Sequence, residues 1–512
     1  MKKHAIYLAL VFSLCVCALH LGSQPASVPA PAQTDEQKIL AALHSISSHT
    51  LLDYVKEMAA DKYGGRLTGT TEYKACAEWT ASLLSKWGVR PAGDGGTYFQ
   101  EFPNPYTLVF PGCEAYLRLP QGPDIIKKYY RFDDEFIPGG TSGAGEVTAE
   151  VVYVGYGVTA PELGYDDYAG VDVKGKILLM ESEAPVTPRQ DAELFKKWRP
   201  YTFHQYKHAN AVAHGAKGMI YNYGPIVNPN NAYNAGFIYS HVGEAVVADI
   251  FAGTGKNHSE TIEAIQKTLK PRSFATGKVF ALKNVTEHHP EGVGQNVIGM
   301  VEGSDPLLKD EVILLGAHLD GQGRCPALMP SANDNASSVA AVLGVAEALS
   351  RCEIKPRRSV VFIFFGAEEQ GVAGSEFYVN NPRFPLEKTA ALINLESAGV
   401  GDRIGVAAAL NFPKLWAYID GANGRYIHRV VRPSFNAFPA RPRQDTARFF
   451  WKGVPSITVD ASESVRSGRP SSYHNTRDNL DLITPEIMED ISRLLFAAVI
   501  QMGRAEALDF RK

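Results

Sequence analysis

The strongest constraint on the fold of this chain is a series of apolar runs of strand length in its last part. These runs cover residues 312–317, 360–365, 391–395 and 456–459. Longer segments separate them, and residues 336–349 have the Ala, Val and Leu pattern and the length of a helix. Strands that alternate with helices form a largely parallel sheet with helices on both faces. The sequence therefore predicts an α/β fold built on a mixed, mostly parallel sheet.

Polar side chains that can bind a metal follow these runs directly. Ligands of open α/β sheets bind just beyond the carboxyl ends of the strands, so parallel strands would gather such side chains at one edge. Five of them follow strand-length runs, and two more can reach the same edge from loops. The first five are His318, Asp320, Glu368, Glu369 and Glu396, and the loop residues are Asp334 and His474.

Taken one at a time, these residues have ordinary structural explanations. A lone histidine such as His318 is more often a hydrogen-bonded core residue, and Asn333-Asp334-Asn335 is a good turn and helix cap. Glu368 and Glu369 alone would be a solvated charge pair. The coincidence of several polar clusters after apolar strands favours a metal site, because burying such groups without partners is costly.

The mixture of residue types suits zinc. Zinc takes neutral imidazole nitrogen and carboxylate oxygen, and a catalytic site leaves one position open. Two ions about 3.5–4 Å apart need a shared ligand, which a carboxylate can provide. A separate carboxylate must accept the proton of the attacking water, and two adjacent glutamates could divide the roles of ligand and base. A carboxylate two residues after a histidine can accept the other imidazole N–H. The set predicts a centre for two zinc ions.

The N-terminus has the pattern of a secretory signal. Lys2 and Lys3 precede an apolar run over residues 5–19, followed by Gly22 and Ser23. We expect a signal peptide at residues 1–23, a Pro/Ala-rich linker at 24–36, and an exported mature chain with no transmembrane span, located in the periplasm or outside the cell. A retained membrane anchor and lipid attachment at Cys15 or Cys17 are the alternatives.

Length and charge bound the remaining possibilities. A chain of 512 residues exceeds the roughly 250–300 residues that one core reaches, so more than one domain is expected. We predict the first part of one domain at 37–120, a β-rich insertion at 121–288 and the catalytic part at 289–512. The net charge of −4 gives no electrostatic basis for binding nucleic acid. The oligomeric state does not follow from the sequence.

The motifs together resemble the di-zinc aminopeptidase and glutamate carboxypeptidase family, in its branch with an inserted protease-associated (PA) domain. Gly64-Gly65-Arg66 and the helix after it look like the N-terminal segment of that family. Gly155-Tyr156-Gly157, Asp166-Asp167-Tyr168 and Lys174-Gly175-Lys176 look like the inserted domain. Asn296-Val297-Ile298-Gly299 leading to His318-Leu319-Asp320 looks like the start of the catalytic part. The resemblance covers nearly all of the mature chain.

The resemblance implies a role for each residue of the site. His318 and Glu396 would hold one zinc ion, Glu369 and His474 would hold the other, and Asp334 would bridge them. Glu368 would be the general base, Asp320 would orient His318, and Tyr473 could donate a hydrogen bond to the oxyanion, although a packed aromatic residue is its alternative.

Two positions depart from the family pattern. Glu396 stands where the family usually has aspartate, and its extra methylene could move a metal ion or the substrate amine by about 1 Å. Gln444-Asp445-Thr446 replaces the usual Ser-Asp-His, with only Asp445 matching.

The predicted function is hydrolysis of N-terminal residues from peptides by an exported zinc aminopeptidase. A carboxypeptidase or dipeptidase of the same fold would need a cation facing the substrate carboxylate, for which Arg189, Arg199 and Arg324 are candidates. A single-zinc glutaminyl cyclase and a non-catalytic binding protein are further alternatives.

Overall fold

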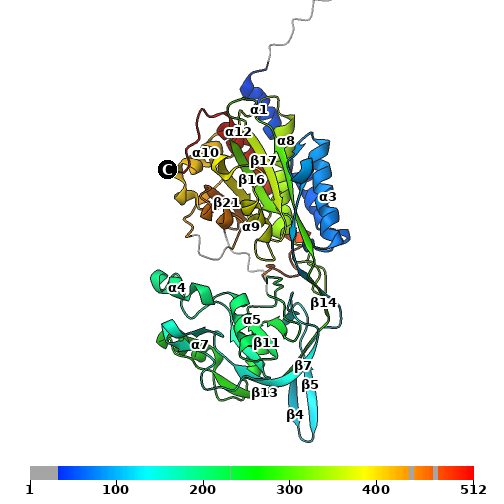
Figure 1. Ribbon diagram of the computed structural model, residues 1–512, viewed down its shortest axis with the longest axis vertical. Helices are drawn as coiled ribbons and strands as arrows, with labels where there is room; N and C mark the ends of the chain where they lie inside the picture. Colours follow the sequence, from blue (N-terminus) through cyan, green and yellow to red (C-terminus); the bar gives the residue numbers. More distant parts are fainter. Residues whose placement is uncertain (1–32, 231, 438–442, 465–470, 512) are drawn as a thin grey trace, which may run out of the picture.

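The computed structural model describes residues 33–511 apart from 231, 438–442 and 465–470. The predicted signal peptide, Cys15 and Cys17 lie outside the described residues, as does most of the predicted linker. The end of that linker is already helical, because α1 (Asp35–His44) begins there with Thr34 as its N-cap. Figure 1 shows two lobes, with the first and last parts of the chain in one and the middle part in the other.

The larger lobe is built on a nine-stranded sheet with the order β1-β15-β17-β16-β18-β21-β19-β20, and β2 also pairs with β15. The four central strands β17, β16, β18 and β21 are parallel, and their neighbours β15 and β19 are antiparallel to them. All four predicted strands are present and parallel, which confirms the predicted fold class. The strands are β1 (Arg90–Pro91), β2 (Phe99–Pro103), β15 (Val293–Val301), β16 (Val312–His318), β17 (Ser359–Phe365), β18 (Thr389–Leu395), β19 (Arg403–Ala407), β20 (Val431–Pro433) and β21 (Ser456–Ser462).

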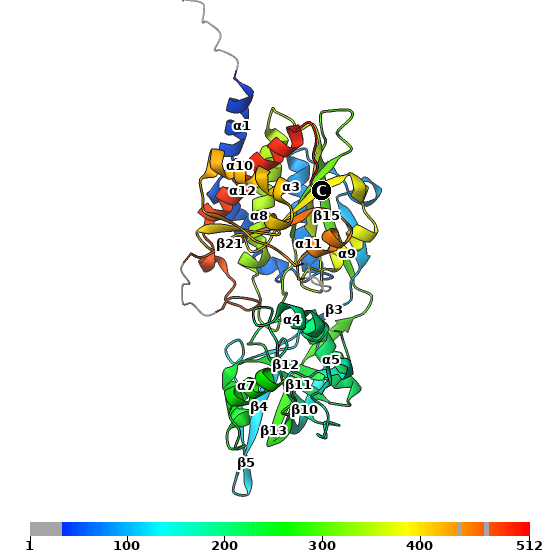
Figure 2. The ribbon, with the colours of Figure 1, turned by 90° about the vertical axis from the view of Figure 1, so that its left-hand side faces the viewer.

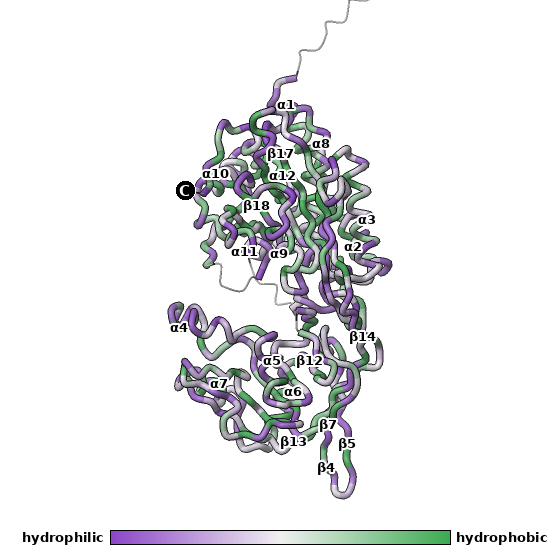
Figure 3. The backbone as a smooth tube through the Cα atoms, viewed as in Figure 1, coloured by the Kyte–Doolittle hydropathy of each residue, from purple (hydrophilic) through white to green (hydrophobic). Residues whose placement is uncertain are grey.

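Helices cover both faces of this sheet. Alternate residues of β16 point to opposite sides, so Ile313 and Leu315 pack in one apolar cluster and Leu314 packs in another. The first cluster includes residues of α2 (Ser48–Met58), α3 (Thr71–Lys86), α8 (Ser338–Arg351), α10 (Pro413–Ala422) and α12 (Pro485–Arg504). The second includes residues of α9 (Ala373–Asn380) and α11 (Thr446–Trp451). Figure 3 shows the apolar strands between these layers.

The smaller lobe contains an eight-stranded sheet with the order β5-β4-β13-β7-β10-β11-β12-β6. Its strands lie between Glu114 and Asn284, and the β4–β5 hairpin extends away from the larger lobe (Figure 1). The predicted boundaries at 121 and 288 remain predictions. The strands are β4 (Glu114–Gln121), β5 (Asp124–Tyr129), β6 (Phe136–Pro138), β7 (Gly145–Tyr153), β10 (Ile177–Glu181), β11 (Gly218–Asn222), β12 (Ile238–Val242) and β13 (Phe274–Asn284). Its helices are α4 (Ala192–Trp198), α5 (His204–Ala213), α6 (Glu244–Phe251) and α7 (His258–Thr268).

Two antiparallel strands connect the lobes. Strand β3 (Tyr106–Val109) enters the smaller lobe and pairs with β14 (Thr286–His289), which leaves it. The Tyr106 and His289 rings stack across this pair at 4.6 Å between centroids. The insertion therefore begins and ends at adjacent points of the larger lobe, as the side view also shows (Figure 2).

Within the described residues, none of the helices combines the length and the apolar character needed to cross a membrane.

Candidate metal centre

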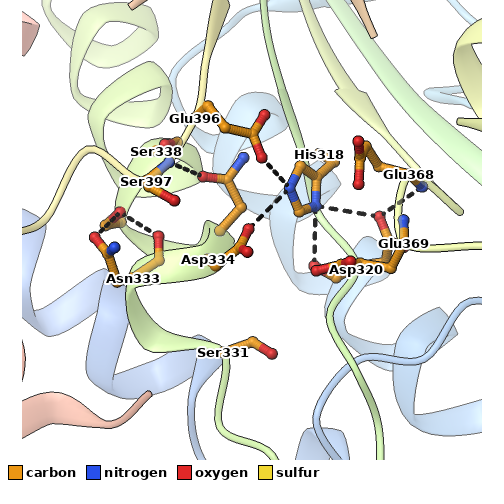
Figure 4. A network of polar contacts seen from close by, with 12 residues as sticks. His318, Asp320, Ser331, Asn333, Asp334, Ser338, Glu368, Glu369, Glu396 and Ser397 are labelled. Atoms are coloured by element: carbon orange, nitrogen blue, oxygen red, sulfur yellow. Dashed lines mark hydrogen bonds and ion pairs between the residues drawn. The ribbon is translucent and has the colours of Figure 1, made fainter. Parts of the chain in front are cut away.

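Three parallel strands deliver the predicted residues to one edge of the sheet. His318 is the last residue of β16, Glu368 and Glu369 follow β17, and Glu396 follows β18. Asp334 reaches the same place from the irregular turn before α8, and ligand atoms of His318, Asp334 and Glu369 lie within 4.8 Å of one another. Figure 4 shows the cluster around His318. The residues predicted to share a site are therefore brought together.

One half of the cluster is centred on the Nε2 atom of His318. This atom lies 3.0 Å from Glu396 Oε1 and 3.3 Å from Asp334 Oδ1. The His318 side chain is completely buried. The extra methylene of Glu396 therefore still leaves its carboxylate oxygen beside the imidazole nitrogen.

The other half is centred on the Nε2 atom of His474. This atom lies 3.2 Å from Glu369 Oε2 and 3.5 Å from Asp334 Oδ2. Asp334 thus presents a different oxygen to each histidine. A carboxylate that faces two nitrogen ligands in this way has the arrangement of a bridging ligand.

The hydrogen bonds at the far side of each ring leave Nε2 directed at the carboxylates. His474 Nδ1 lies 3.0 Å from the carbonyl oxygen of Val227, which can only accept, so Nδ1 carries a proton. His318 Nδ1 lies 3.4 Å from Asp320 Oδ1 and 3.3 Å from the Asp320 carbonyl. In the neutral rings, the Nε2 lone pairs then face carboxylate oxygens, and a cation between them would satisfy both groups.

The electrostatics of the cluster also call for a cation. Burial alone lowers the pKa of His474, but the charges of Glu369 and Asp334 outweigh it and raise the pKa to about 10. Burial likewise lowers the pKa of His318, and Glu396 and its other carboxylate neighbours raise it well above its usual value. The negative charge of the carboxylates therefore stabilises positive charge at both ring nitrogens.

Three buried carboxylate oxygens fit the need of a metal ion for ligands. Glu369 Oε1 and Glu396 Oε2 are buried and accept no hydrogen bond, and Asp334 Oδ1 has only the ion pair with His318 Nε2 at 3.3 Å. Buried charged oxygens of this kind are costly unless they are paired or coordinate a metal. Two imidazole nitrogens with three carboxylates are a donor set that zinc takes in proteins. The residues present therefore fit a zinc site with Asp334 at its middle.

Asp320 ties two strand ends together beneath the cluster. Its Oδ1 accepts the backbone N–H of Glu368 and its Oδ2 accepts that of Glu369, each at 3.2 Å. The same carboxylate lies beside His318 Nδ1 (Figure 4). One buried side chain thus fixes both the imidazole and the turn that carries the two glutamates.

Glu368 lies beside the two histidine–carboxylate pairs. Its carboxylate forms no ion pair with either histidine among the interactions of the described residues, in contrast to Glu369 and Glu396. Burial raises the pKa of Glu368 well above its usual value, His318 opposes this, and Glu396 and Glu369 add to the rise.

The two asparagines around Asp334 attach its turn to the segment after β18. Asn335 accepts the N–H of Ser397 at 2.9 Å and donates to the Leu395 carbonyl at 3.1 Å. Asn333 accepts the N–H of Gly399 at 2.9 Å. The Asn-Asp-Asn motif therefore connects Asp334 to the loop that carries Glu396.

Two buried side chains that support these loops were not identified from the sequence. Asp478 accepts the backbone N–H groups of Asn333 at 2.8 Å and Asp334 at 3.0 Å. Arg66 donates to the carbonyls of Leu319 and Ser331 at 2.9 and 2.8 Å, which lie beside the His318 and Asp334 segments. The Gly64-Gly65-Arg66 motif therefore places a buried arginine against the two segments that carry His318 and Asp334.

The site opens into a pocket of about 170 Å³ between the two lobes. Glu368, Glu369, Tyr473 and His474 line it from the larger lobe, and Glu183, Arg199, Phe203, Tyr221 and Tyr223 line it from the smaller lobe. The Tyr473 ring stacks on the His474 ring at 3.6 Å between centroids. Half of Tyr473 is exposed, and the burial of the remainder, followed by the charges of Glu369 and Asp334, raises its pKa above the usual value, so its hydroxyl keeps its proton.

The structure separates the three arginines considered for a carboxylate site. Arg199 lies in the pocket wall, where it donates to Thr202 Oγ1 at 2.9 Å and packs 4.2 Å from the Phe203 ring centre. Arg324 pairs instead with Asp61 at 3.2 Å, and Arg189 is exposed and does not line this pocket.

The departure at Gln444-Asp445-Thr446 has a local structural explanation. Thr458 of β21 donates to Gln444 at 3.1 Å, and the Thr446 and Thr458 hydroxyls lie 3.2 Å apart. Asp445 between them is completely buried. Burial raises its pKa to about 7, and the nearby His318 opposes this rise. The replaced residues therefore hold α11 on β21, while Asp445 lies close to the candidate site.

Two comparisons with family descriptions cover most of the two lobes. Residues 296–499 match peptidase family M28. Residues 147–255 match the PA domain. The first match includes all the candidate metal ligands, and the second lies within the inserted lobe.

Individual relatives agree with these matches. Leupeptin-inactivating enzyme 1 of Streptomyces exfoliatus is 37% identical over 230 residues, which are 41% of this chain and 49% of the relative. Aminopeptidase YwaD of Bacillus subtilis is 26% identical over 363 residues, which are 68% of each protein. The chain thus spans about half of the first relative and about two thirds of the second.

Solved structures share the fold across both lobes. An aminopeptidase from Aneurinibacillus sp. strain AM-1 superposes with a TM-score of 0.63 and 20% identity, covering 93% of this chain and 98% of that one. A zinc aminopeptidase from Bacillus subtilis gives a TM-score of 0.57 and 19% identity, covering 91% and 98%. These findings confirm the predicted resemblance: residues 296–499 match peptidase family M28, residues 147–255 match the PA domain, and both lobes have the fold of solved aminopeptidases.

Proposed function

We propose that this protein is a zinc-dependent aminopeptidase that removes N-terminal residues from peptides with the help of two zinc ions. The observation that carries the proposal is the position of Asp334, whose two oxygens face the Nε2 atoms of His318 and His474 separately. The names of the relatives and of the structures with the same fold support the aminopeptidase assignment.

In the proposed centre, His318 and Glu396 would hold one ion, His474 and Glu369 would hold the other, and Asp334 would be shared between them. Zinc bound there would polarise the scissile carbonyl and lower the pKa of the attacking water. Glu368 accepts the proton of that water and passes it to the leaving amine. Asp320 keeps His318 in the tautomer that leaves Nε2 free.

Tyr473 is proposed to stabilise the oxyanion. Its hydroxyl stays protonated beside the carboxylates and lines the same pocket as Glu368. The surplus of carboxylates would hold the free α-ammonium group of the substrate, which accounts for the selectivity for N-termini.

The pocket between the lobes limits the substrate. Residues of both lobes line this pocket, so we expect the inserted lobe to restrict cleavage to short peptides or flexible chain ends. The charged and apolar pattern of residues 1–23 supports export of the enzyme.

The test is mass spectrometry of a mixed peptide library incubated with the purified mature protein, with and without a zinc chelator. Chelator-sensitive, stepwise loss from the N-terminus is expected, and loss from the C-terminus would refute the aminopeptidase assignment. The variant E368Q should retain zinc and lose about 10²–10⁴-fold in rate. The exposed variant E193Q serves as its control, and a binding protein would be unaffected by E368Q.

A dipeptidase is the second candidate, because Arg199 lies in the pocket wall. A guanidinium group there could pair with the C-terminal carboxylate of a dipeptide. Comparing dipeptides with a free and an amidated C-terminus tests this, since only a dipeptidase would require the carboxylate.

A further inference from the structure

The inserted lobe makes direct contact with one of the proposed metal ligands. The carbonyl oxygen of Val227 accepts the Nδ1–H of His474 at 3.0 Å. The backbone N–H of the same Val227 donates to the His474 carbonyl at 2.8 Å. His474 is thus held at both its ring and its backbone by a single residue that belongs to the other lobe.

A second contact from the inserted lobe holds the residues just after His474. Asp133 pairs with Arg477 at 3.3 Å and also accepts a hydrogen bond from the Thr476 hydroxyl. The ligand and the turn that follows it therefore both depend on side chains or backbone of the insertion.

The segment that carries Val227 is fixed in turn by His241 of β12. His241 Nδ1 lies 2.9 Å from the Ile226 carbonyl oxygen, so this nitrogen donates. The ring is completely buried and lies near the Tyr221 ring, at 5.4 Å between centroids. A chain of contacts thus runs from His241 through Ile226 and Val227 to His474.

The Val227 side chain connects the insertion to a second part of the site. It packs in a small buried cluster with Cys325 and Met329, which lie on the segment between Asp320 and Asp334. The same residue therefore touches the His474 loop by its backbone and the segment before Asp334 by its side chain.

We infer that the inserted PA domain is an integral part of the metal centre and that His241 is a positioning residue for the zinc ion held by His474 and Glu369. This inference rests on the proposed two-zinc site and adds to it a requirement that the insertion be correctly placed. A carbonyl that accepts the far N–H of a ligating histidine fixes its tautomer and ring orientation. Displacing Val227 should therefore lower the affinity for the zinc ion held by His474 and Glu369. The affinity for the ion held by His318 should not change.

The test compares substitutions at His241 that keep or move the donor. In H241N the side-chain NH₂ lies near the position of Nδ1 and should keep the bond to Ile226. In H241Q the donor lies farther out, and in H241F it is absent. His208 is an equally buried histidine of the same lobe that packs on Phe237 and Tyr239, so H208F is the matched control.

Two readouts follow metal binding without relying on activity. Zinc per chain is measured at a series of buffered free-zinc concentrations, and the visible absorption spectrum of the cobalt-loaded protein reports on the ligand geometry. Circular dichroism confirms that each variant is folded. We expect H241Q and H241F to bind the weaker zinc ion about tenfold less tightly, in the range typical of partners that orient a ligand. H241N and H208F should match the unmodified protein.

Equal zinc binding by H241Q, H241N and the unmodified protein would overturn the inference, and so would an equal loss in H208F. If H241F does not fold, the comparison of H241N with H241Q still decides the question. The variant D133A removes the contact of Asp133 with Thr476 and Arg477, and it should also lower the affinity for the zinc ion held by His474 and Glu369. An unmodified protein that binds fewer than two zinc ions would refute the proposed centre itself, whereas two tightly bound ions in H241Q would refute only the role of His241.

Discussion

Glu396 shows how one extra methylene can be accommodated at a proposed ligand position. Its Oε1 atom lies 3.0 Å from His318 Nε2, although the family usually has the shorter aspartate at this position. The backbone around Glu396 is held by the bond from its N–H to the Val459 carbonyl at 3.0 Å. From this backbone position the glutamate reaches the His318 ring.

We predict that E396D will lower activity rather than restore a family optimum. Shortening the side chain withdraws the carboxylate from His318, and a shift of about 1 Å at a catalytic centre can cost up to about 100-fold in rate. Steady-state kinetics on an aminoacyl p-nitroanilide, with zinc content measured in parallel, checks this. Activity equal to or above that of the unmodified protein would contradict it.

Asp478 is predicted to control the bridging residue through its backbone. In D478N one carboxylate oxygen becomes an NH₂ group that faces a backbone N–H of Asn333 or Asp334. The turn should shift, and zinc affinity should fall by about tenfold. Zinc competition with a chromogenic chelator measures this, with the exposed D481N as control. Identical affinities in the two variants would show that the turn holds without Asp478.

At the scale of helices and strands, the inserted lobe contains a buried histidine whose titration opposes folding. His208 of α5 is 2% exposed, and burial lowers its pKa to about 4 from the usual value near 6.5. The unfolded chain binds this proton below pH 6.5, whereas the folded chain binds it only near pH 4. The stability of the folded state is therefore complete above pH 6.5 and is lost as the pH falls towards 4.

We predict that His208 alone removes about 3 kcal/mol of stability between pH 6.5 and pH 4. H208F should flatten this part of the pH profile, because phenylalanine fits between Phe237 and Tyr239 and cannot titrate. Urea unfolding followed at several pH values measures the effect. Replacing the exposed His49 by Gln should leave the slope unchanged, and an unchanged slope in H208F would contradict the prediction.

The strands that carry the candidate site could be predicted from the sequence, whereas several contacts that support them could not. The strands before His318, Glu368 and Glu396 could be predicted because buried parallel strands are continuous apolar runs, and strand ends gather in space. The contribution of Val227 could not, since a backbone carbonyl leaves no mark on residue identity. The supporting role of Asp478 could not be predicted, because Asn475-Thr476-Arg477 before it has the composition of an exposed turn. Its burial results from the tertiary fold. The predicted helix at 336–349 begins later, at Ser338, because the residues before it form the turn that carries Asp334.

At the scale of the whole molecule, the proposed ligands come from well-separated segments. They lie after β16, before α8, after β17, after β18 and in the loop of His474. An ion that binds only when all these segments are folded stabilises the folded state by mass action.

We predict that the melting temperature will rise with the free-zinc concentration. At about 1,000 times the dissociation constant, one ion contributes roughly 4 kcal/mol. Differential scanning calorimetry with chelator and with buffered zinc measures this, and D334N, which lacks the bridging charge, should respond much less. A melting temperature independent of zinc would show that the metal does not link these segments.

The paired strands β3 and β14 have a consequence for protein engineering. Because Val109 pairs with Thr286, a short turn between them could reconnect the backbone and delete everything in between. The path of the backbone alone would therefore allow the insertion to be removed as one cassette. Its side-chain and backbone contacts would not, because the deletion would also remove the partners of His474 and Arg477. Chimaeras between relatives should therefore exchange this cassette together with the segment around His474.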